Sequence, residues 1–455
     1  MAFDFDPGRD REEERGQRHG GGFLLPGWRR LESLGHLRAV WAEVDLEAIM
    51  ANVRAIRSHL AAPAATADVS IGHTAVGRAR VPAIMAIVKA NGYGHGAAPV
   101  AAAALAAGAE RLGVAIVEEA LTLRHAGIEA PIHILGQPPA GQASLVVSGG
   151  FSCAVCDLEA ARALAAAARE QGTVARVHVK IDTGMSRLGV LPEAASDLVE
   201  QLVSIPGLSV EGAFTHFSSA DEVDKTYTRA QFERFMAVKQ ELEKRGFRLP
   251  YWHAANSATT IDLPEMALDG VRPGIILYGL WPSRQVGHAA VTLRPAMSLK
   301  ARLSFVKQVP AGVPVSYGRT FWTERPTTLG VIPIGYADGY TRLLSGKAEV
   351  LFKGARVPVV GRICMDQCVV AIPDSPRGSE ETGERPIPAR SGDEVVIIGR
   401  QLDDEITVDD VAARLGTINY EVVCMVGARV PRVYRYADAW WVAPDVVVAP
   451  GGRRE

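Results

Sequence analysis

The chain has 455 residues, of which 48% are hydrophobic and 22% charged, and its formal net charge is −2. This length is enough for two or three domains, and the small net charge excludes a strong electrostatic attraction to nucleic acid or to an anionic membrane. No apolar run is as long as a membrane span, so we expect no membrane segment. The chain begins with a charged, Gly-rich stretch without an apolar signal core. We therefore expect residues 1–37 to be a disordered tail and the protein to be cytoplasmic.

The first predicted helix covers residues 45–60, and Asp45 is placed to cap its N-terminus. Apolar side chains recur along it at helical spacing, which predicts one buried face. These side chains are Leu46, Ile49, Met50, Val53, Ile56 and Leu60. An Ala-, Thr- and Gly-rich segment at 61–81 follows the helix and predicts a surface insertion.

Short strand-like runs then alternate with helical ones, of which 157–172 and 227–246 are the clearest. The eight strand-like runs are 83–89, 112–117, 132–136, 151–156, 175–182, 210–217, 251–256 and 269–273. Eight strands that alternate with helices favour an α/β fold, a (β/α)₈ TIM-like barrel, over residues 38–288. A doubly wound parallel sheet is the alternative.

The pattern changes after residue 288. Short alternating strands with glycine turns occupy 348–372 and 392–400, and a helical pattern returns only at about 407–415. Residues 289–455 are therefore predicted to form a C-terminal, mainly β domain, with an exposed loop at 373–392.

The five cysteines form no disulfide framework, because their number is odd and the chain is long. Cys153 and Cys156 make a lone C-x-x-C pattern inside a strand-like run, without a second pair at zinc spacing. Ordinary buried thiols are the favoured interpretation, and a metal or redox role is the alternative.

In a barrel of this type, functional side chains gather at the carboxyl ends of the strands, because that face is built from the loops between strand and helix. Polar side chains follow the predicted strands at these ends. They are Lys89, Lys180, Asp182, Arg187, His216, His253, Asn256, Ser257 and Arg272. Their positions predict one site at the mouth of the barrel.

Lys89 suggests amine chemistry, because a lysine at a barrel strand end can form a Schiff base with a carbonyl. Gly274 and Ile275 follow the last strand, where backbone N–H groups at a helix start can hold a phosphate. With Arg272 as a cation for a ring nitrogen, these groups suggest pyridoxal 5′-phosphate. The alternatives are a solvated rim lysine, a structural His216 and an Arg272 that pairs with a carboxylate.

Nine separated segments resemble the motifs of alanine racemases, and they occur in that family's order between residue 40 and about residue 435. They are AIVKANGYGHG, KIDTGMSRLGV, THFSSAD, HAANSAT, VRPGIILYGL, VSYGRT, IGYADGY, GRICMDQ and INYEVV. The tail, the 61–81 insertion and the 373–392 loop lie outside the resemblance. Two small departures are Gly92 and Ser186, where many relatives have alanine and glycine, and neither touches a catalytic role.

The resemblance implies that Lys89 carries pyridoxal phosphate and is one catalytic base, and that Tyr317, reaching over from the other subunit of a homodimer, is the second. The residues expected to contact the cofactor are Lys89, Tyr93, Arg187, His216, Asn256, Ser257, Arg272, Gly274, Ile275 and Tyr420. Arg187, Met365 and Tyr336 are expected to bind the substrate or line its entrance. Lys180 matches a lysine that is often carbamylated, and no metal is expected.

The implied reaction is the interconversion of L-alanine and D-alanine, which supplies D-alanine for peptidoglycan precursors. Two bases on opposite faces suit a proton that leaves one face and returns on the other. Because a phenol normally has a pKa of about 10, we expect positive charge from Arg187 or His216 to assist Tyr317. The alternatives are a decarboxylase of basic amino acids, a pyridoxal-phosphate carrier and a racemase with another substrate such as serine.

Overall fold

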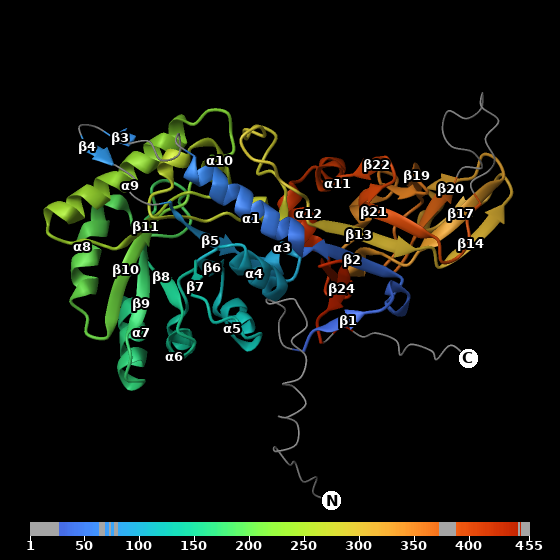
Figure 1. Cartoon of the computed structure of the whole chain (residues 1–455). Helices are drawn as coiled ribbons and strands as arrows, with labels where there is room; N and C mark the ends of the chain where they lie inside the picture. The colour runs from blue at the N-terminus through green and yellow to red at the C-terminus, as the bar shows by residue number, and fades with distance from the viewer. Residues whose placement is uncertain are drawn as a thin grey trace, which may run out of the picture.

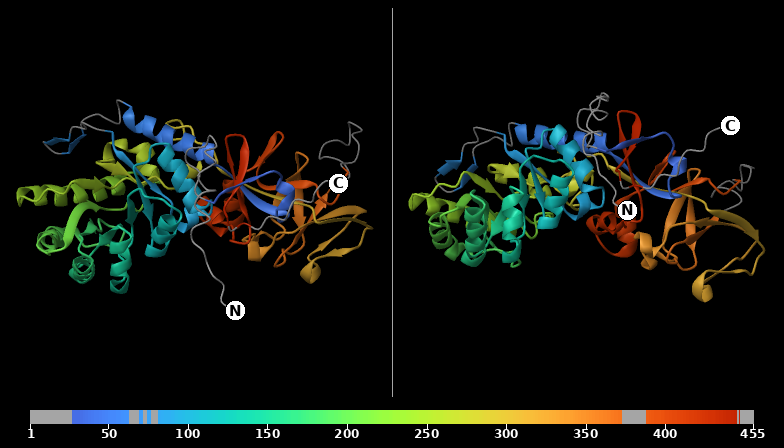
Figure 2. Two further views of the ribbon diagram at one scale, coloured as in Figure 1. Left: turned by 60° about the horizontal axis from the view of Figure 1, so that its bottom comes forward. Right: turned by 90° about the horizontal axis from the view of Figure 1, so that it is seen from below.

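In the computed structural model, the described residues are 27–62, 69–71, 74–76, 81–372, 388–444 and 446. They form two parts, a barrel of parallel strands wrapped by helices and a mainly β part (Figure 1). Figure 2 shows the two parts side by side from two other directions. The predicted fold class, a barrel followed by a mainly β domain, is therefore confirmed.

The barrel sheet has eight parallel strands in the order β11-β10-β9-β8-β7-β6-β5-β12. The strands are β5 Ala83–Ile87, β6 Arg111–Val114, β7 Ile132–Ile134, β8 Ser152–Val155, β9 Ala175–Lys180, β10 Leu208–Phe214, β11 Tyr251–His253 and β12 Gly270–Val271. Hydrogen bonds between Trp252 and Asp269 bring the two ends of the sheet together, since the N–H of Asp269 donates to the carbonyl of Trp252 over 3.0 Å. Neighbours in sequence are neighbours in the sheet, which excludes the doubly wound alternative.

Helices cover the outside of the barrel, so its strands are buried on both faces and rich in Ile, Val and Ala. These helices are α1 Leu46–Ala61, α4 Ala97–Ala106, α5 Val117–His125, α6 Ala143–Ser148, α7 Leu158–Glu170, α8 Pro192–Val203, α9 Thr226–Lys244 and α10 Ser257–Asp262. The predicted cap of α1 is confirmed, because the Asp45 carboxylate accepts a hydrogen bond of 3.0 Å from the N–H of Ala48.

The β domain is built on a twelve-stranded sheet, ordered β1-β24-β23-β2-β13-β21-β18-β19-β20-β17-β14, with β22 on β21. Its strands are β1 Arg29–Leu31, β2 Val40–Asp45, β13 Met297–Arg302, β14 Phe305–Val309, β17 Thr327–Ile332, β18 Glu349–Phe352, β19 Ala355–Val360, β20 Cys368–Ile372, β21 Glu394–Gln401, β22 Asp404–Ile406, β23 Arg432–Tyr436 and β24 Ala439–Val442. Two short ribbons are β15 Pro314–Val315 with β16 Phe321–Trp322, and β3 Val69–Ile71 with β4 Thr74–Val76.

Helix α11 (Val408–Leu415) confirms the helical pattern predicted near 407–415, and α12 (Asn419–Met425) follows it unpredicted. Short 3₁₀ turns connect the strands of both parts. They are η2 Leu34–His36, η3 Ala140–Gln142, η4 Pro264–Met266, η5 Ile275–Tyr278, η6 Tyr317–Arg319, η7 Tyr336–Asp338 and η8 Arg342–Leu344.

The N-terminal segment differs from the sequence prediction. Residues 29–36, expected in a disordered tail, form β1 and η2, and β1 pairs antiparallel with β24. Strand β2, expected in the barrel, pairs with β13 and β23 of the large sheet. In Figure 2 this dark blue segment lies among the red and orange strands. The physical reason is that the partners of β2, which are β13 and β23, lie more than 250 residues further along the chain, so the local pattern around β2 does not reveal them.

Three predicted segments lie partly outside the described residues. Residues 1–26 of the tail and 373–387 of the predicted loop are outside them, as are 63–68, 72–73 and 77–80 of the predicted insertion. The described remainder of that insertion contains the β3–β4 ribbon.

Within the described residues, no helix is both long enough and apolar enough to cross a membrane. All five cysteines are free thiols. Burial raises the pKa of Cys153 to about 12 and that of Cys156 to about 11, so both thiols stay protonated. Protonated, largely buried thiols support the favoured interpretation of this C-x-x-C pair.

Candidate active site

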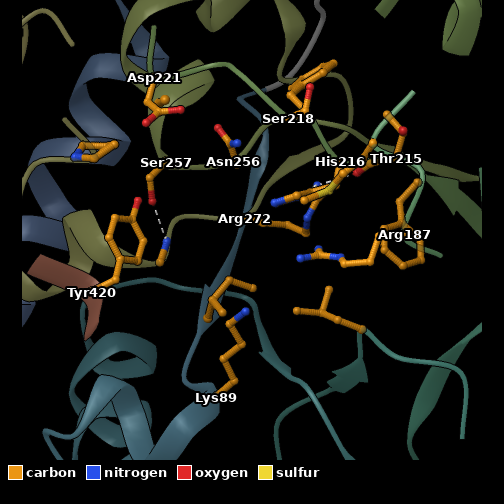
Figure 3. A pocket seen from close by; sticks show the side chains of 18 of the residues that line it. Lys89, Arg187, Thr215, His216, Ser218, Asp221, Asn256, Ser257, Arg272 and Tyr420 are labelled. Atoms are coloured by element: carbon orange, nitrogen blue, oxygen red, sulfur yellow. Dashed lines mark hydrogen bonds between the residues drawn. The ribbon is translucent and has the colours of Figure 1, made fainter. Parts of the chain in front are cut away.

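A cavity of about 590 Å³ opens at the carboxyl ends of the barrel strands, where α12 of the β domain covers part of it (Figure 3). The sequence-predicted residues that line it are Lys89, Tyr93, Lys180, Asp182, Arg187, His216, Asn256, Ser257, Arg272, Gly274 and Tyr420. The barrel therefore brings these residues together from the ends of five strands, β5, β9, β10, β11 and β12, and α12 of the other domain adds one.

Lys89 stands just beyond β5, with its side chain pointing into the cavity (Figure 3). Burial lowers the pKa of Lys89, and the nearby charge of Arg187 lowers it further, against the opposite effect of Glu119. Glu119 also fixes the backbone here, because its carboxylate accepts hydrogen bonds from the N–H groups of Ala90 over 2.6 Å and Ala115 over 2.7 Å. A lysine with a lowered pKa can act as a nucleophile and as a base near neutral pH.

The turn that follows Lys89 is left-handed. In α3 (Lys89–Tyr93), the φ angle is 51° at Ala90, 51° at Asn91 and 49° at Tyr93. Each such residue with a side chain costs roughly 1–2 kcal/mol, so the turn stores strain beside the lysine. Asn91 has a compensating contact, because its side-chain oxygen accepts a hydrogen bond of 2.9 Å from the N–H of Ala97 at the start of α4.

Arg272 lies in the middle of the cavity floor (Figure 3). Its Nη1 donates to the carbonyl of His253 over 2.8 Å, and its Nη2 donates to the carbonyls of Thr215 over 2.7 Å and Ala254 over 2.9 Å. Burial lowers the pKa of Arg272 to about 10, which still leaves the group charged at neutral pH. Among the described residues, its Nε–H has no hydrogen-bond partner and is left to donate to a ligand.

His216 is neutral, in contrast to one expectation from the sequence. Burial, and then the charge of Arg272, with a smaller effect of Arg187, lower its pKa well below the usual value. His216 therefore supplies no positive charge near neutral pH, which leaves Arg187 as the sequence-predicted cation for assisting Tyr317.

Lys180 is also held in its neutral form. Burial, followed by the charges of Arg272 and Arg187, lowers the pKa of Lys180 well below its usual value. Its amine lies 4.2 Å from the centroid of the Phe214 ring. Because only a neutral amine reacts with carbon dioxide, this environment suits the carbamylation that the sequence suggested.

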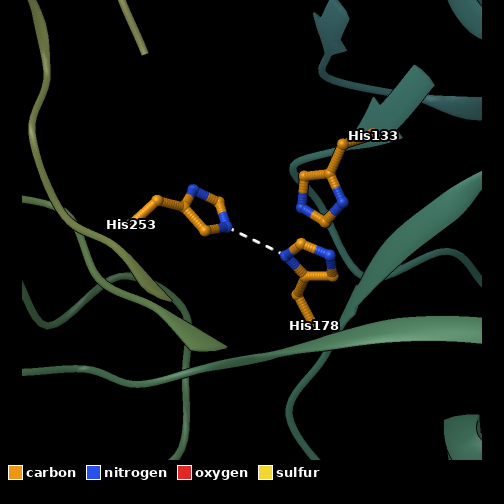
Figure 4. A group of neighbouring side chains, drawn as sticks. All are labelled: His133, His178 and His253. Carbon is orange, nitrogen blue, oxygen red and sulfur yellow. Dashed lines mark hydrogen bonds between the residues drawn. The ribbon is translucent and has the colours of Figure 1, made fainter. Parts of the chain in front are cut away.

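Three buried histidines, His133, His178 and His253, form a layer inside the barrel (Figure 4), and His253 contacts Arg272. Arg272 donates to Nδ1 of His253 over 2.9 Å, and Nε2 of His253 lies 2.9 Å from Nδ1 of His178. Because arginine can only donate, Nδ1 of His253 accepts and its Nε2 carries the proton that His178 accepts. The arginine thus fixes the tautomers of both rings.

Three histidines this close can also form a metal site. A metal at Nε2 of His253 would have to displace the proton given to His178 while Arg272 still donated to the other ring nitrogen. Burial and the neighbouring charges lower the pKa of all three rings, so the layer is neutral. The hydrogen-bond pattern therefore favours a neutral polar layer that orients Arg272.

We expect the protein to lose stability in mild acid. Histidines that are buried and neutral in the folded chain take up protons when it unfolds, so acid favours the unfolded state. Burial lowers the pKa of His95 to about 4, whereas an unfolded histidine titrates at about 6.5. The resulting loss of stability begins as the pH falls below the unfolded pKa of about 6.5 and continues toward the folded pKa, amounting to roughly 2 kcal/mol by pH 5. Urea unfolding between about pH 7.5 and 5 measures this.

The variant His95→Gln should lose less stability over that range, whereas His288→Gln, at an exposed site, should follow the unmodified protein. A urea midpoint that stayed constant between these pH values would contradict the assignment of neutral histidines.

Gly274, Ser257 and Tyr93 form a narrow cradle at the other end of the cavity. The N–H of Gly274 donates to Oγ of Ser257 over 2.8 Å. A Cβ atom at Gly274 would lie 2.6 Å from Oη of Tyr93, so no larger residue fits without displacing the tyrosine. Backbone N–H groups, a hydroxyl and a phenol around open space are suited to an anion such as phosphate.

Two further tyrosines flank Tyr93. Its ring centroid lies 4.9 Å from that of Tyr278 and 6.1 Å from that of Tyr420, which reaches into the cavity from α12. Burial raises the pKa of Tyr93 and of Tyr420, so both phenols keep their protons and can donate to an anion.

Two residues expected to contact the cofactor have other roles for their side chains. Asn256 caps α10, because its side-chain oxygen accepts a hydrogen bond of 3.1 Å from the N–H of Thr259. The side chain of Ile275 is fully buried and does not line the cavity, which leaves its backbone N–H for a ligand.

Tyr317, Tyr336 and Met365 do not line this cavity within one chain. They lie on neighbouring loops of the β domain, linked through Cys364, and their side chains are 69%, 43% and 53% exposed. Large exposed side chains on one surface are typical of a contact with another molecule.

Two family models match the chain. The model described as the alanine racemase N-terminal domain matches residues 72–282, and the model of the C-terminal domain matches residues 296–434. The chain belongs to the alanine racemase family. The alanine racemase of Desulfovibrio desulfuricans is 49% identical over 397 residues, which are 87% of this chain and 98% of that protein.

Solved structures of the family and of a related racemase are similar throughout. That of the alanine racemase of Clostridium difficile 630 covers 90% of this chain and 99% of its own, with a TM-score of 0.79 and 36% identity. A histidine racemase of Leuconostoc mesenteroides covers 88% of this chain and 98% of its own, with a TM-score of 0.76 and 27% identity.

The alanine racemase family uses pyridoxal 5′-phosphate, which confirms the predicted cofactor. The residues of this cavity fit that group. Lys89 offers an amine for the carbonyl group of the cofactor, and Arg272 offers an unpaired N–H at the cavity floor. Gly274 lies in the cradle suited to the phosphate, where a side chain would clash with Tyr93.

Sequence reasoning missed Glu119, Tyr278 and Cys424 around the cavity. Cys424 follows Tyr420 by four residues on α12, and this spacing, one helical turn, could have indicated that both face the cavity. Glu119 and Tyr278 gave no such signal, because they act on the backbone of the Lys89 segment, and Oη of Tyr278 donates to the carbonyl of Ile87 over 2.9 Å.

Proposed function

We propose that the chain interconverts L-alanine and D-alanine with pyridoxal phosphate bound to Lys89, and that it supplies D-alanine for peptidoglycan precursors. The single observation that carries the proposal is the lysine of lowered pKa that shares one cavity with Arg272. Relatives named alanine racemase, at 49% and 47% identity over most of the chain, support the same activity.

Each residue of the cavity has a proposed task. Lys89 holds the carbonyl carbon of the cofactor, Arg272 donates to its ring nitrogen, and His216 packs beside its ring. The phosphate is held by Tyr93, Ser257, Gly274, Ile275 and Tyr420, and Asn256 contributes by capping α10, the helix that begins with Ser257. Bound pyridoxal phosphate withdraws electron density from the Cα of the substrate and so acidifies its proton.

Arg272 decides how far this electron withdrawal goes. It stays charged and can only donate, so it gives the ring nitrogen a hydrogen bond without protonating it. A carboxylate partner, as expected in a decarboxylase of basic amino acids, would keep that nitrogen protonated. The arginine therefore supports racemisation with few side reactions over decarboxylation.

The proton of the substrate is moved by two bases in this proposal. Lys89 takes or gives it on one face of Cα, and Tyr317 of the partner subunit acts on the other. Arg187 binds the substrate carboxylate and supplies positive charge. Tyr336 and Met365 line the entrance from the same partner. General acid–base assistance of this kind contributes about 10²–10⁴ in rate.

Lys180 is proposed to carry a carbamate that holds Arg187 in place, since its amine is neutral and lies near that arginine. Incorporation of carbon-13 from labelled bicarbonate, followed by NMR, tests this directly. A spectrum without a carbamate signal would leave Lys180 as a neutral amine.

We also infer the setting in which the enzyme works. It is a homodimer with shared active sites in the cytoplasm, and it divides after residue 288 into a barrel and a β domain. Strands β1 and β2 join the sheet of the second part. The exposure of Tyr317, Tyr336 and Met365 supports the shared site.

The test is a chiral assay in heavy water with L-alanine and pyridoxal phosphate. Deuterated D-alanine is the expected product. Release of carbon dioxide from lysine, arginine or ornithine with alanine untouched would instead assign a decarboxylase. Faster racemisation of serine or histidine than of alanine would change the substrate, and binding of the cofactor without any turnover would indicate a carrier.

The substitution Gly274→Ala should weaken the binding of pyridoxal phosphate by roughly tenfold or more, because the added Cβ meets Oη of Tyr93 and fills the phosphate cradle. Titration of the protein with the cofactor, followed by absorbance, measures the change. Gly141→Ala is the matched control, because nothing lies within 4 Å of the added Cβ there. If the two variants bound pyridoxal phosphate with equal affinity, the cradle at Gly274 would not be the phosphate site.

A further inference from the structure

We infer that Arg432, on β23 of the β domain, is a positioning residue that holds the left-handed Lys89 turn of the barrel in its strained form. The inference rests on the proposed function for the role of Lys89, but the contacts that carry it belong to the protein alone.

Arg432 is a buried cation that is held by carbonyl groups. Only 9% of the residue is exposed, and its Nε donates to the carbonyl of Gly94 over 3.0 Å. Its Nη1 donates to Gly427 over 2.5 Å and Val430 over 2.8 Å, and its Nη2 donates to Val426 over 2.5 Å. No described carboxylate pairs with it, so the four carbonyl groups must compensate for its burial.

These contacts join two segments that both reach the cavity. Gly94 ends the turn that begins at Lys89, whereas Val426 and Gly427 follow directly on α12, which carries Tyr420 and Cys424. In Figure 1, α3 and α12 lie side by side where the two parts of the molecule meet. One guanidinium therefore fixes the distance between the lysine turn and the helix of the phosphate-binding tyrosine.

The end of the Lys89 turn is packed tightly against the β domain. A Cβ atom at Gly94 would lie 2.1 Å from the carbonyl oxygen of Val423, and one at Gly96 would lie 2.0 Å from Oη of Tyr434. The β domain thus packs directly against the end of the turn, where only glycine leaves enough space. Ala90, Asn91 and Tyr93 adopt a left-handed backbone that side chains disfavour, so the turn needs contacts from outside to persist.

Lysine cannot replace arginine in this role. The guanidinium is planar and presents donors in a fixed fork, which here reaches carbonyls on two sides. An ammonium at the same place would keep the charge but could not reach Gly94 and the end of α12 together. The variant Arg432→Lys therefore removes the link and keeps the charge.

The experiment compares Arg432→Lys with Arg435→Met, which lies on the same strand, is partly exposed and pairs with Asp45. Amide hydrogen exchange across residues 89–96, measured with and without cofactor, should become roughly tenfold faster in Arg432→Lys. Its affinity for pyridoxal phosphate should fall roughly tenfold or more, and the pH at which the covalent absorbance band is lost should shift. Arg435→Met should stay within about twofold of the unmodified protein in each.

A second variant separates positioning from general stability. Ala90→Gly removes a side chain that disfavours the left-handed turn, so in the Arg432→Lys background it should recover part of the lost affinity. Ala98→Gly, in the right-handed helix α4, should recover none. The inference is overturned if Arg432→Lys lowers the melting temperature but leaves exchange at 89–96 unchanged, or if both glycine variants behave alike. Failure of the unmodified protein to bind cofactor would count against the proposed function, while the exchange measurement would still decide the role of Arg432.

Discussion

Mixing a Lys89→Ala chain with a Tyr317→Phe chain should restore activity to roughly a quarter of the unmodified level. Each variant alone lacks one base in both of its sites. In a randomly reassembled population, half of the dimers are mixed, and each mixed dimer has one site with both bases and one with neither. Tyr317 lies outside the cavity of its own chain, with a largely exposed side chain, which is the arrangement that a shared site requires.

The experiment needs a step of dissociation and reassembly, followed by measurement of D-alanine formation. The control mixes Lys89→Ala with a chain that carries both substitutions, because that mixed dimer contains no intact site and should stay inactive. Recovery in neither mixture would show that Lys89 and Tyr317 do not meet across a dimer interface.

Lys89→Ala should lower the rate of racemisation by roughly 10³ or more, since it removes both the covalent anchor of the cofactor and one base. The same change should abolish the absorbance of covalently bound cofactor. Borohydride reduction followed by peptide mapping should label Lys89 in the unmodified chain.

Lys244→Ala, at the exposed end of α9, is the control and should keep both activity and label. If reduction labelled Lys180 instead of Lys89, the roles of the two cavity lysines would be exchanged. If Lys89→Ala kept its activity, the proposed mechanism would fail even with the cofactor bound.

Local patterns in the sequence were sufficient to predict the barrel and the side of it that carries the site. Eight apolar runs separated by helices, each ending near a polar residue, indicate a parallel barrel whose carboxyl ends meet. This logic placed Lys89, Lys180 and Arg272 in one cavity, where the structure has them. The cap at Asp45 followed from residue type and position alone.

Features that depend on contacts between distant segments were not predictable in this way. The left-handed turn at Ala90 runs against the preference of alanine and is held by the β domain. Nothing in the residues around β2 distinguishes a barrel strand from a strand of the other sheet, because its partners are supplied by the far end of the chain. The neutrality of His216 also arises from its surroundings, which are burial and the charges of Arg272 and Arg187 at the ends of two different strands.

The pairing of β2 with β23 has a consequence for how the chain is made. Residues 390 positions apart, Asp45 and Arg435, are joined by an ion pair between these two strands. During synthesis, β2 leaves the ribosome early, gains its neighbour β13 only after about two thirds of the chain, and its neighbour β23 only near the end. Such a contact of high sequence separation slows folding and leaves an apolar strand exposed in the interim. Because Arg432 arrives on that same late strand, the lysine turn would gain its support only when translation is nearly complete.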